Sequence, residues 1–133
     1  MILVDTSVWI ETFKRTGPLD LETAVPFHDV VTCLPVIQEV LQGFAGEQSF
    51  RLAREAMLNL PIVESPMTVS LVDQAIDLYR AARRQGLTVR SSVDCLIAVC
   101  ALRHDLEVLH RDRDFSLLAK VSGLRERSLI ARA

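Results

Sequence analysis

The sequence has no apolar run long enough to span a bilayer, although half of its 133 residues are hydrophobic. It has only three cysteines, which are odd in number and form no C-x-x-C pair, so neither a disulfide framework nor a thiolate zinc site is expected. The first residues, MILVDTSVW, lack the basic start and the small-residue cleavage site of a signal peptide. We therefore expect a cytoplasmic protein with free, buried thiols.

The sequence also lacks a large net charge of either sign, because acidic and basic residues nearly balance. The net charge of -2 neither indicates nor excludes a nucleic-acid partner. Lysine is rare, because thirteen of the fifteen basic residues are arginine, whose planar fork suits phosphate groups better. Genomic base composition also produces such a preference, so both explanations stay open. The length fits one compact domain, which we expect to span residues 1–133.

Four short, continuously apolar segments are typical of strands buried on both faces of a parallel sheet. They are Ile2–Val4, Val30–Cys33, Pro61–Val63 and Glu107–Leu109, and a fifth strand is predicted at Ser128–Ile130. Helices are predicted between them at Val8–Lys14, Val36–Phe44, Phe50–Leu58, Val69–Gln85, Val93–Arg103 and Phe115–Val121. Because parallel strands need crossover connections, this alternation predicts an α/β domain with a mainly parallel sheet covered on both faces.

Two aspartates follow predicted strands at the point where the chain leaves the sheet. Asp5 comes directly after the first strand and Asp112 after the fourth. Ligands of open α/β sheets bind at this carboxyl edge, and the two carboxylates converge if the strands are neighbours. Each residue also has a purely structural explanation, Asp5 as the N-cap of the next helix and Asp112 or Asp114 as a turn residue.

Two further acids lie in the first turns of predicted helices. Asp94 opens a helix that is apolar on nearly every side, and Ser91 with Asp94 also matches the spacing of a capping box. Glu39 falls off the apolar stripe of its helix, as a solvated glutamate would. Carboxylates that gather at one edge repel each other, and a divalent cation relieves this repulsion. Oxygen ligands without histidine or cysteine favour Mg²⁺ or Mn²⁺ over Zn²⁺, and such an ion supports phosphodiester hydrolysis.

Six arginines are candidates for RNA contact, namely Arg80, Arg83, Arg84, Arg90, Arg111 and Arg113. The first four lie near the end of a predicted helix and in the loop after it. There, a solvated helix end whose dipole is complemented by cations is the alternative explanation. Trp9 is predicted to belong to the core or to an interface rather than to stack on a base.

These motifs resemble the PIN-domain ribonucleases and, within that family, the VapC-type toxins of bacterial toxin-antitoxin pairs. The resemblance runs nearly end to end and rests on MILVDTSVWIE, PVIQEVLQGF and GLTVRSSVDCLIAVCALRHDLEVLHRDRDF. It implies a three-layer α/β/α fold with strand order 3-2-1-4-5. The residues that match the family's metal ligands are Asp5, Glu39, Asp94 and Asp112. Asp114 matches a more variable acid, and Thr6 and Ser7 match hydroxyl residues beside the first aspartate.

One position departs from the family's pattern. His110 stands where the family often has Thr or Ser, two residues before the last metal-binding aspartate. One interpretation is a ring that caps the end of the strand. The other is a phosphate contact or an auxiliary proton carrier.

The resemblance implies a toxin that cleaves RNA endonucleolytically, using water activated by a divalent metal and leaving a 5′ phosphate and a 3′ hydroxyl. It also implies a homodimer and a cognate VapB-like antitoxin that blocks the acidic cleft. Two alternatives are a Mg²⁺-dependent phosphoacceptor or phosphotransfer domain, which also places Asp after the first strand, and an inactive PIN-like binding module. The family motifs argue against the first, and the presence of all four acids argues against the second.

Overall fold

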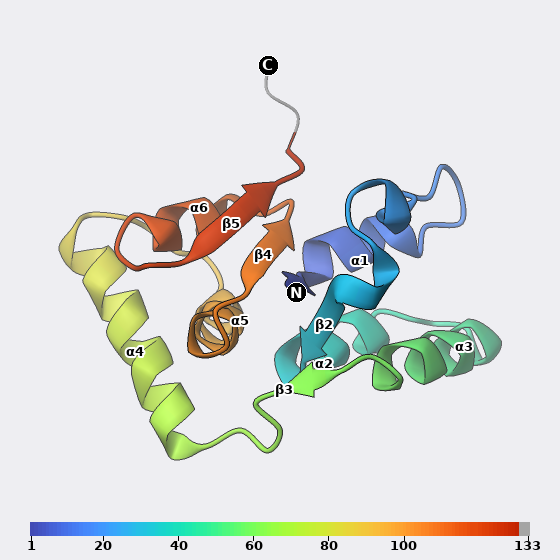
Figure 1. The fold of residues 1–133 in the computed structure, drawn as a ribbon, viewed down its shortest axis with the longest axis horizontal. Coiled ribbons are helices and arrows are strands. Elements are labelled where there is room, and N and C mark those ends of the chain that lie inside the picture. The colour runs from blue at the N-terminus through green and yellow to red at the C-terminus, as the bar shows by residue number, and fades with distance from the viewer. Residues whose placement is uncertain (131–133) are drawn as a thin grey trace.

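The structure is a computed structural model, which describes residues 1–130 (Figure 1). Its strands form one parallel sheet with the order β3-β2-β1-β4-β5. They are β1 (Ile2–Val4), β2 (Val30–Cys33), β3 (Ile62–Val63), β4 (Glu107–His110) and β5 (Arg125–Ser128). The predicted α/β class, the parallel sheet and the strand order are confirmed.

The connections between these strands are helical. The α-helices are α1 (Thr6–Thr12), α2 (Leu34–Gln42), α3 (Glu47–Leu58), α4 (Val69–Arg84), α5 (Ser92–Arg103) and α6 (Arg113–Ala119). Figure 1 shows α3 and α4 at opposite ends of the molecule. Helices α1 and α6 begin two residues earlier than predicted, because the side chains of Asp5 and Asp112 accept backbone N–H groups of their first turns.

The centre of the molecule is built from the middle strands and helix α5. Leu3, Val4, Val108 and Leu109 have no exposed surface. Helix α5 is apolar almost all round, since the residues from Ile97 to Ala101 are completely buried. Strand segments buried on both faces explain why continuous apolar runs predicted them correctly.

The fifth strand lies elsewhere than predicted. It spans Arg125–Ser128 rather than Ser128–Ile130, and its register pairs Glu107 with Arg125 and His110 with Ser128. This strand forms one edge of the sheet and most of it is exposed, so charged residues can occupy it. The predicted strand, chosen for its apolar residues, therefore begins three residues too late.

The helices of residues 1–130 are shorter than a membrane-spanning helix. The α4 helix spans 16 residues, and no helix in that part of the chain combines the length and hydropathy needed to cross a bilayer.

Candidate functional site

Strands β1 and β4 are neighbours, and this brings Asp5 and Asp112 to the same edge of the sheet. Val4 lies opposite Leu109, and the Asp5 N–H donates to the Leu109 carbonyl at 2.9 Å. The Ser7 hydroxyl donates to Asp5 Oδ2 and accepts the Arg111 N–H at 2.9 Å. Ser7 therefore ties together the two loops that carry these aspartates.

Three carboxylates form a tight group at this edge. Oxygens of Asp94, Asp112 and Asp114 all lie within 4.8 Å of one another. Asp94 comes from the first turn of α5, and Asp114 from the first turn of α6. Asp114, expected only as an accessory acid, thus belongs to the group. Asp5 and Glu39 lie outside it by this measure, although the charge of Asp5 still acts on Asp94.

In two of the aspartates, one carboxylate oxygen accepts backbone hydrogen bonds and the other has no hydrogen-bond partner within residues 1–130. Asp5 Oδ2 accepts the Ser7 N–H at 3.0 Å, and Asp114 Oδ2 accepts the N–H groups of Arg90 at 2.9 Å and Ser91 at 3.1 Å. Their other oxygens, like Asp94 Oδ2, are buried and have no hydrogen-bond partner within residues 1–130. Buried carboxylate oxygens without partners are costly, so these donor atoms fit a hard cation such as Mg²⁺ or Mn²⁺.

The capping-box interpretation of Asp94 is wrong. Ser91 is the N-cap of α5, but among the described residues its side chain makes no capping bond. The Ser91 N–H, which a capping box would direct to Asp94, is bound by Asp114 instead. The capping box therefore does not explain the position of Asp94, although an acid in the first turn of α5 still complements the helix dipole.

Burial and mutual repulsion disfavour the ionised forms of two aspartates. Burial, then the interaction with Asp112, and then neighbouring carboxylate charges raise the pKa of Asp94 from 3.8 to about 10. Burial also raises the pKa of Asp5 from 3.8 to about 6, although its bonds with Ser7 oppose the change. Without a cation, the acids of this site do not all carry a charge at neutral pH.

Glu39 approaches the site from helix α2. Its Oε1 accepts the Thr6 hydroxyl at 2.9 Å, and Thr6 directly follows Asp5. The side chain is half-buried, so Glu39 is not the freely solvated glutamate of the alternative interpretation. The two hydroxyl residues have separate partners, because Ser7 binds Asp5 and Thr6 binds Glu39.

His110 lies behind the acidic group. Its ring has no exposed surface, packs against Phe115 with centroids 5.2 Å apart, and accepts the Asp112 N–H on Nδ1 at 3.1 Å. Burial lowers the pKa of His110. Because the ring has no exposed surface, the interpretation as a direct phosphate contact is wrong, and Nδ1 caps the backbone at the end of the strand. The interpretation as an auxiliary proton carrier stays a prediction.

Two neighbours of His110 were not predicted from the sequence. Glu126 places Oε1 3.7 Å from His110 Nε2, and Ser116 donates to the same oxygen at 2.6 Å. The alternation Arg125-Glu126-Arg127 was the available signal, because it turns Glu126 to the opposite side of β5 from the arginines. This alternation could not be used, because the strand was predicted at Ser128–Ile130 and did not include Glu126.

Three of the candidate arginines adjoin the acidic group through the backbone. Arg90 donates its N–H to Asp114, and Arg111 and Arg113 flank Asp112 in the chain. All three side chains are exposed. The Arg111 guanidinium also pairs with Glu11 at 2.8 Å.

The remaining candidate arginines lie on the last turns of α4, and all are exposed: Arg80, Arg83 and Arg84. Arg83 lies over the ring of Tyr79, 5.7 Å from its centroid. Their position at the C-terminus of a helix agrees with the dipole explanation. Trp9 is buried and stacks on Phe13, with ring centroids 5.7 Å apart, as expected for a core residue.

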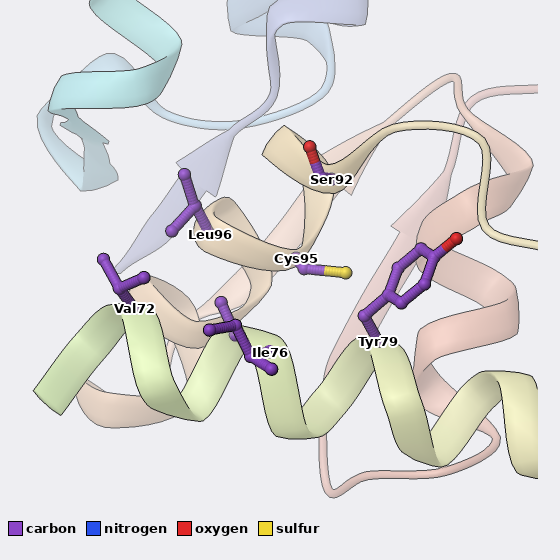
Figure 2. Close-up of a pocket in the computed structure, with 7 residues that line it drawn as sticks. Val72, Ile76, Tyr79, Ser92, Cys95 and Leu96 are labelled. Atoms are coloured by element: carbon purple, nitrogen blue, oxygen red, sulfur yellow. The ribbon is translucent and has the colours of Figure 1, made fainter. Parts of the chain in front are cut away.

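A cavity of about 350 Å³ lies between α4 and α5. Figure 2 shows its labelled side chains, Val72, Ile76, Tyr79, Ser92, Cys95 and Leu96, and Ala75 completes the lining. None of these residues carries a charge, so the cavity offers contact to apolar groups rather than acid or metal chemistry.

The PIN domain family model matches residues 2–121 of the chain. Ribonuclease VapC11 of Mycobacterium tuberculosis is 37% identical, and the alignment covers 96% of this chain and 98% of that protein. The structure of VapBC2 from Rickettsia felis, bound to a promoter DNA fragment, is similar with a TM-score of 0.75 at 14% identity, covering 96% of this chain and 98% of that one. The structure of VapBC-5 from M. tuberculosis, a member of the VapBC family of toxin-antitoxin systems, is similar with a TM-score of 0.70 at 21% identity, covering 96% of this chain and 98% of that one. The chain therefore belongs to the PIN domain family, within its VapC group.

Proposed function

We propose that this chain is the toxin of a type II toxin-antitoxin pair and acts as a divalent-metal-dependent endoribonuclease. Its membership of the PIN family and its similarity to a protein named as a VapC ribonuclease support the nuclease activity. One observation carries the metal dependence. Buried carboxylate oxygens of Asp5, Asp94 and Asp114 lie without partners within residues 1–130.

Asp94, Asp112 and Asp114 would hold Mg²⁺ or Mn²⁺, and Asp5 and Glu39 would complete the acidic set. This grouping differs from the expected quartet by the addition of Asp114. A divalent cation at such a site supplies charge stabilisation on a phosphoryl oxygen and a lowered pKa for water.

The protein's own groups prepare this site before any ligand arrives. Ser7 holds Asp5 in place through its hydroxyl, and Thr6 holds the carboxylate of Glu39. Glu39 is half-buried, as is Asp112, whereas the other three acids are buried, and we assign to Glu39 the orientation of the attacking water. Because Arg90 and Arg111 are exposed beside the acids, we assign them to the backbone phosphates of RNA.

The protein partners that we propose are a VapB-like antitoxin and a second copy of the chain. The similar solved structures are named VapBC, which supports the first. Exposed Val72 and Ile76 on α4, at the border of the α4–α5 cavity, support the second. Replacing Ile76 by Glu should give a monomer in light scattering. An unchanged dimer would place the second copy elsewhere.

The proposed activity is tested by incubating the purified chain with cellular RNA in Mg²⁺ or Mn²⁺ and sequencing the cleaved ends. Cleavage should stop in EDTA and in Asp94→Asn, because the loss of one charge removes the cation. Glu107→Gln removes an acid from the other end of β4 and is the matched control, which should cleave normally. Full, chelator-sensitive cleavage by Asp94→Asn would contradict the assignment. An aspartyl-phosphate adduct after acetyl phosphate treatment would favour a phosphoacceptor domain instead.

A further inference from the structure

A fully buried histidine directly supports the backbone that carries Asp112. His110 is the last residue of β4, and its Nδ1 accepts the Asp112 N–H at 3.1 Å. Its carbonyl accepts the Leu129 N–H at 2.7 Å, which anchors the residue to the segment after β5. The backbone of His110 is thus held by the sheet, while its ring contacts the candidate metal-binding loop.

The far side of the ring faces a second pair of polar groups. Since Nδ1 accepts a hydrogen bond, the proton of the neutral ring lies on Nε2. Nε2 is 3.7 Å from Glu126 Oε1, which is too long for a hydrogen bond, and it has no hydrogen-bond partner within residues 1–130, so Glu126 attracts this N–H electrostatically. The Ser116 hydroxyl donates to that same oxygen at 2.6 Å. Ser116 belongs to α6, the helix that Asp112 caps through Oδ1. Polar contacts therefore connect β5, His110, the Asp112 loop and α6.

We propose that His110, Glu126 and Ser116 are positioning residues that fix the Asp112 carboxylate for binding a divalent cation. This inference rests on the proposed function, in which Asp112 is a metal ligand. Ser116 holds Glu126 by a hydrogen bond, the Glu126 carboxylate attracts the Nε2–H side of the ring, and Nδ1 of the ring holds the Asp112 N–H. Groups that orient a ligand in this way typically change metal affinity by about 10- to 100-fold.

The competing explanation is that His110 only fills space in the core. Two amide substitutions separate the explanations, because they reproduce different nitrogens of the ring. In His110→Asn an oxygen takes the position of Nδ1 and can accept the Asp112 N–H. In His110→Gln the amide reaches toward Glu126 and fills more of the ring's volume, but it leaves the Asp112 N–H without this acceptor. If the ring only fills space, His110→Gln should bind Mn²⁺ better than His110→Asn, and if the ring positions Asp112, His110→Asn should bind Mn²⁺ better.

The experiment titrates the purified, full-length chain with Mn²⁺ and measures its dissociation constant by calorimetry. Thermal melting in EDTA checks the fold of every variant. We expect His110→Gln to bind at least about tenfold more weakly than wild type, and His110→Asn, which keeps the acceptor for the Asp112 N–H but loses the contact with Glu126, to fall between the two. Glu126→Leu should also weaken binding. Glu107→Gln is the control, because it removes a carboxylate from a strand paired with β5 at the end away from Asp112.

The outcomes distinguish this inference from the proposed function. If wild type binds Mn²⁺, Asp94→Asn does not, and folded His110→Gln and Glu126→Leu bind normally, the positioning role is refuted while the metal site stands. Stronger binding by His110→Gln than by His110→Asn would also overturn it. If wild type binds no Mn²⁺, or Asp94→Asn binds as wild type does, the proposed metal site fails and the inference fails with it.

Discussion

Replacing Asp94 by asparagine should stabilise the metal-free protein while it destroys cation binding. The pKa of Asp94 is about 10 in the folded chain, against an ordinary value of 3.8. At pH 7 the unfolded carboxyl is therefore ionised, and the folded one is protonated. The interval from the ordinary pKa to pH 7 is about three units at about 1.4 kcal/mol each, so the acid opposes folding by on the order of 4 kcal/mol.

Asparagine has nearly the same shape and no proton to bind, so it removes this penalty. Its amide needs hydrogen bonds of its own, and we therefore expect a gain of roughly 2–4 kcal/mol in the free energy of unfolding. The measurement is urea unfolding, followed by circular dichroism, in EDTA at pH 7. Glu107→Gln is the control, since it removes a partly exposed acid and should change stability by less than about 0.5 kcal/mol.

The same linkage predicts how the stability of the metal-free wild type depends on pH. Above pH 3.8 the unfolded chain loses a proton that folded Asp94 keeps until about pH 10. The unfolded state then binds fewer protons, so stability falls as pH rises, by up to about 1.4 kcal/mol per pH unit. Asp5, with a pKa of about 6, adds to this decline below that pH.

Two results would refute this reasoning. One is an Asp94→Asn variant that is less stable than wild type in EDTA at pH 7. The other is a variant whose stability declines with pH as steeply as that of wild type. Adding Mn²⁺ at a thousand times its dissociation constant should reverse the order, because it stabilises wild type by about 4.1 kcal/mol and the variant by nearly nothing.

Three further substitutions test other parts of the structure. Thr6→Val removes the hydroxyl that holds Glu39 and should lower kcat for RNA cleavage about 10-fold or more, while the thermal stability stays unchanged. A normal kcat would show that Glu39 does not need this hydrogen bond. Gly86→Ala should lower the free energy of unfolding in urea by about 1 kcal/mol, because φ is +75°, whereas Gly123→Ala, with open space around it, should be nearly neutral. Equal values for the two glycines would contradict the backbone argument. Arg103→Ala removes two hydrogen bonds to α4 and should cost about 1–2 kcal/mol in the same assay, and no loss would mean that these bonds are replaced by water.

The sequence predicted the central strands because burial on both faces demands continuous apolar residues. This reasoning located β1, β2 and β4, whose residues are mostly buried. It misplaced β5 because an edge strand is selected by backbone pairing and tolerates charge, as Arg125 and Glu126 show. The alternation of strands and helices was sufficient for the fold class.

The site was predictable where it follows from strand order alone. Asp5 and Asp112 meet because β1 and β4 are neighbours. The choice between capping and function at Asp94 depended on which acid binds the Ser91 N–H, and that acid is Asp114, 23 residues away. The place of Asp114 in the acidic group and the contacts of His110 were hidden for the same reason, since tertiary contacts decide both.

Both margins of the sheet discourage lengthening by an added strand. At one margin β3 offers only two residues of pairing, and at the other β5 presents arginine and glutamate side chains. A short or charged border is a common protection against uncontrolled strand exchange and fibre growth. We therefore expect every stable assembly of this protein to be built through its helices.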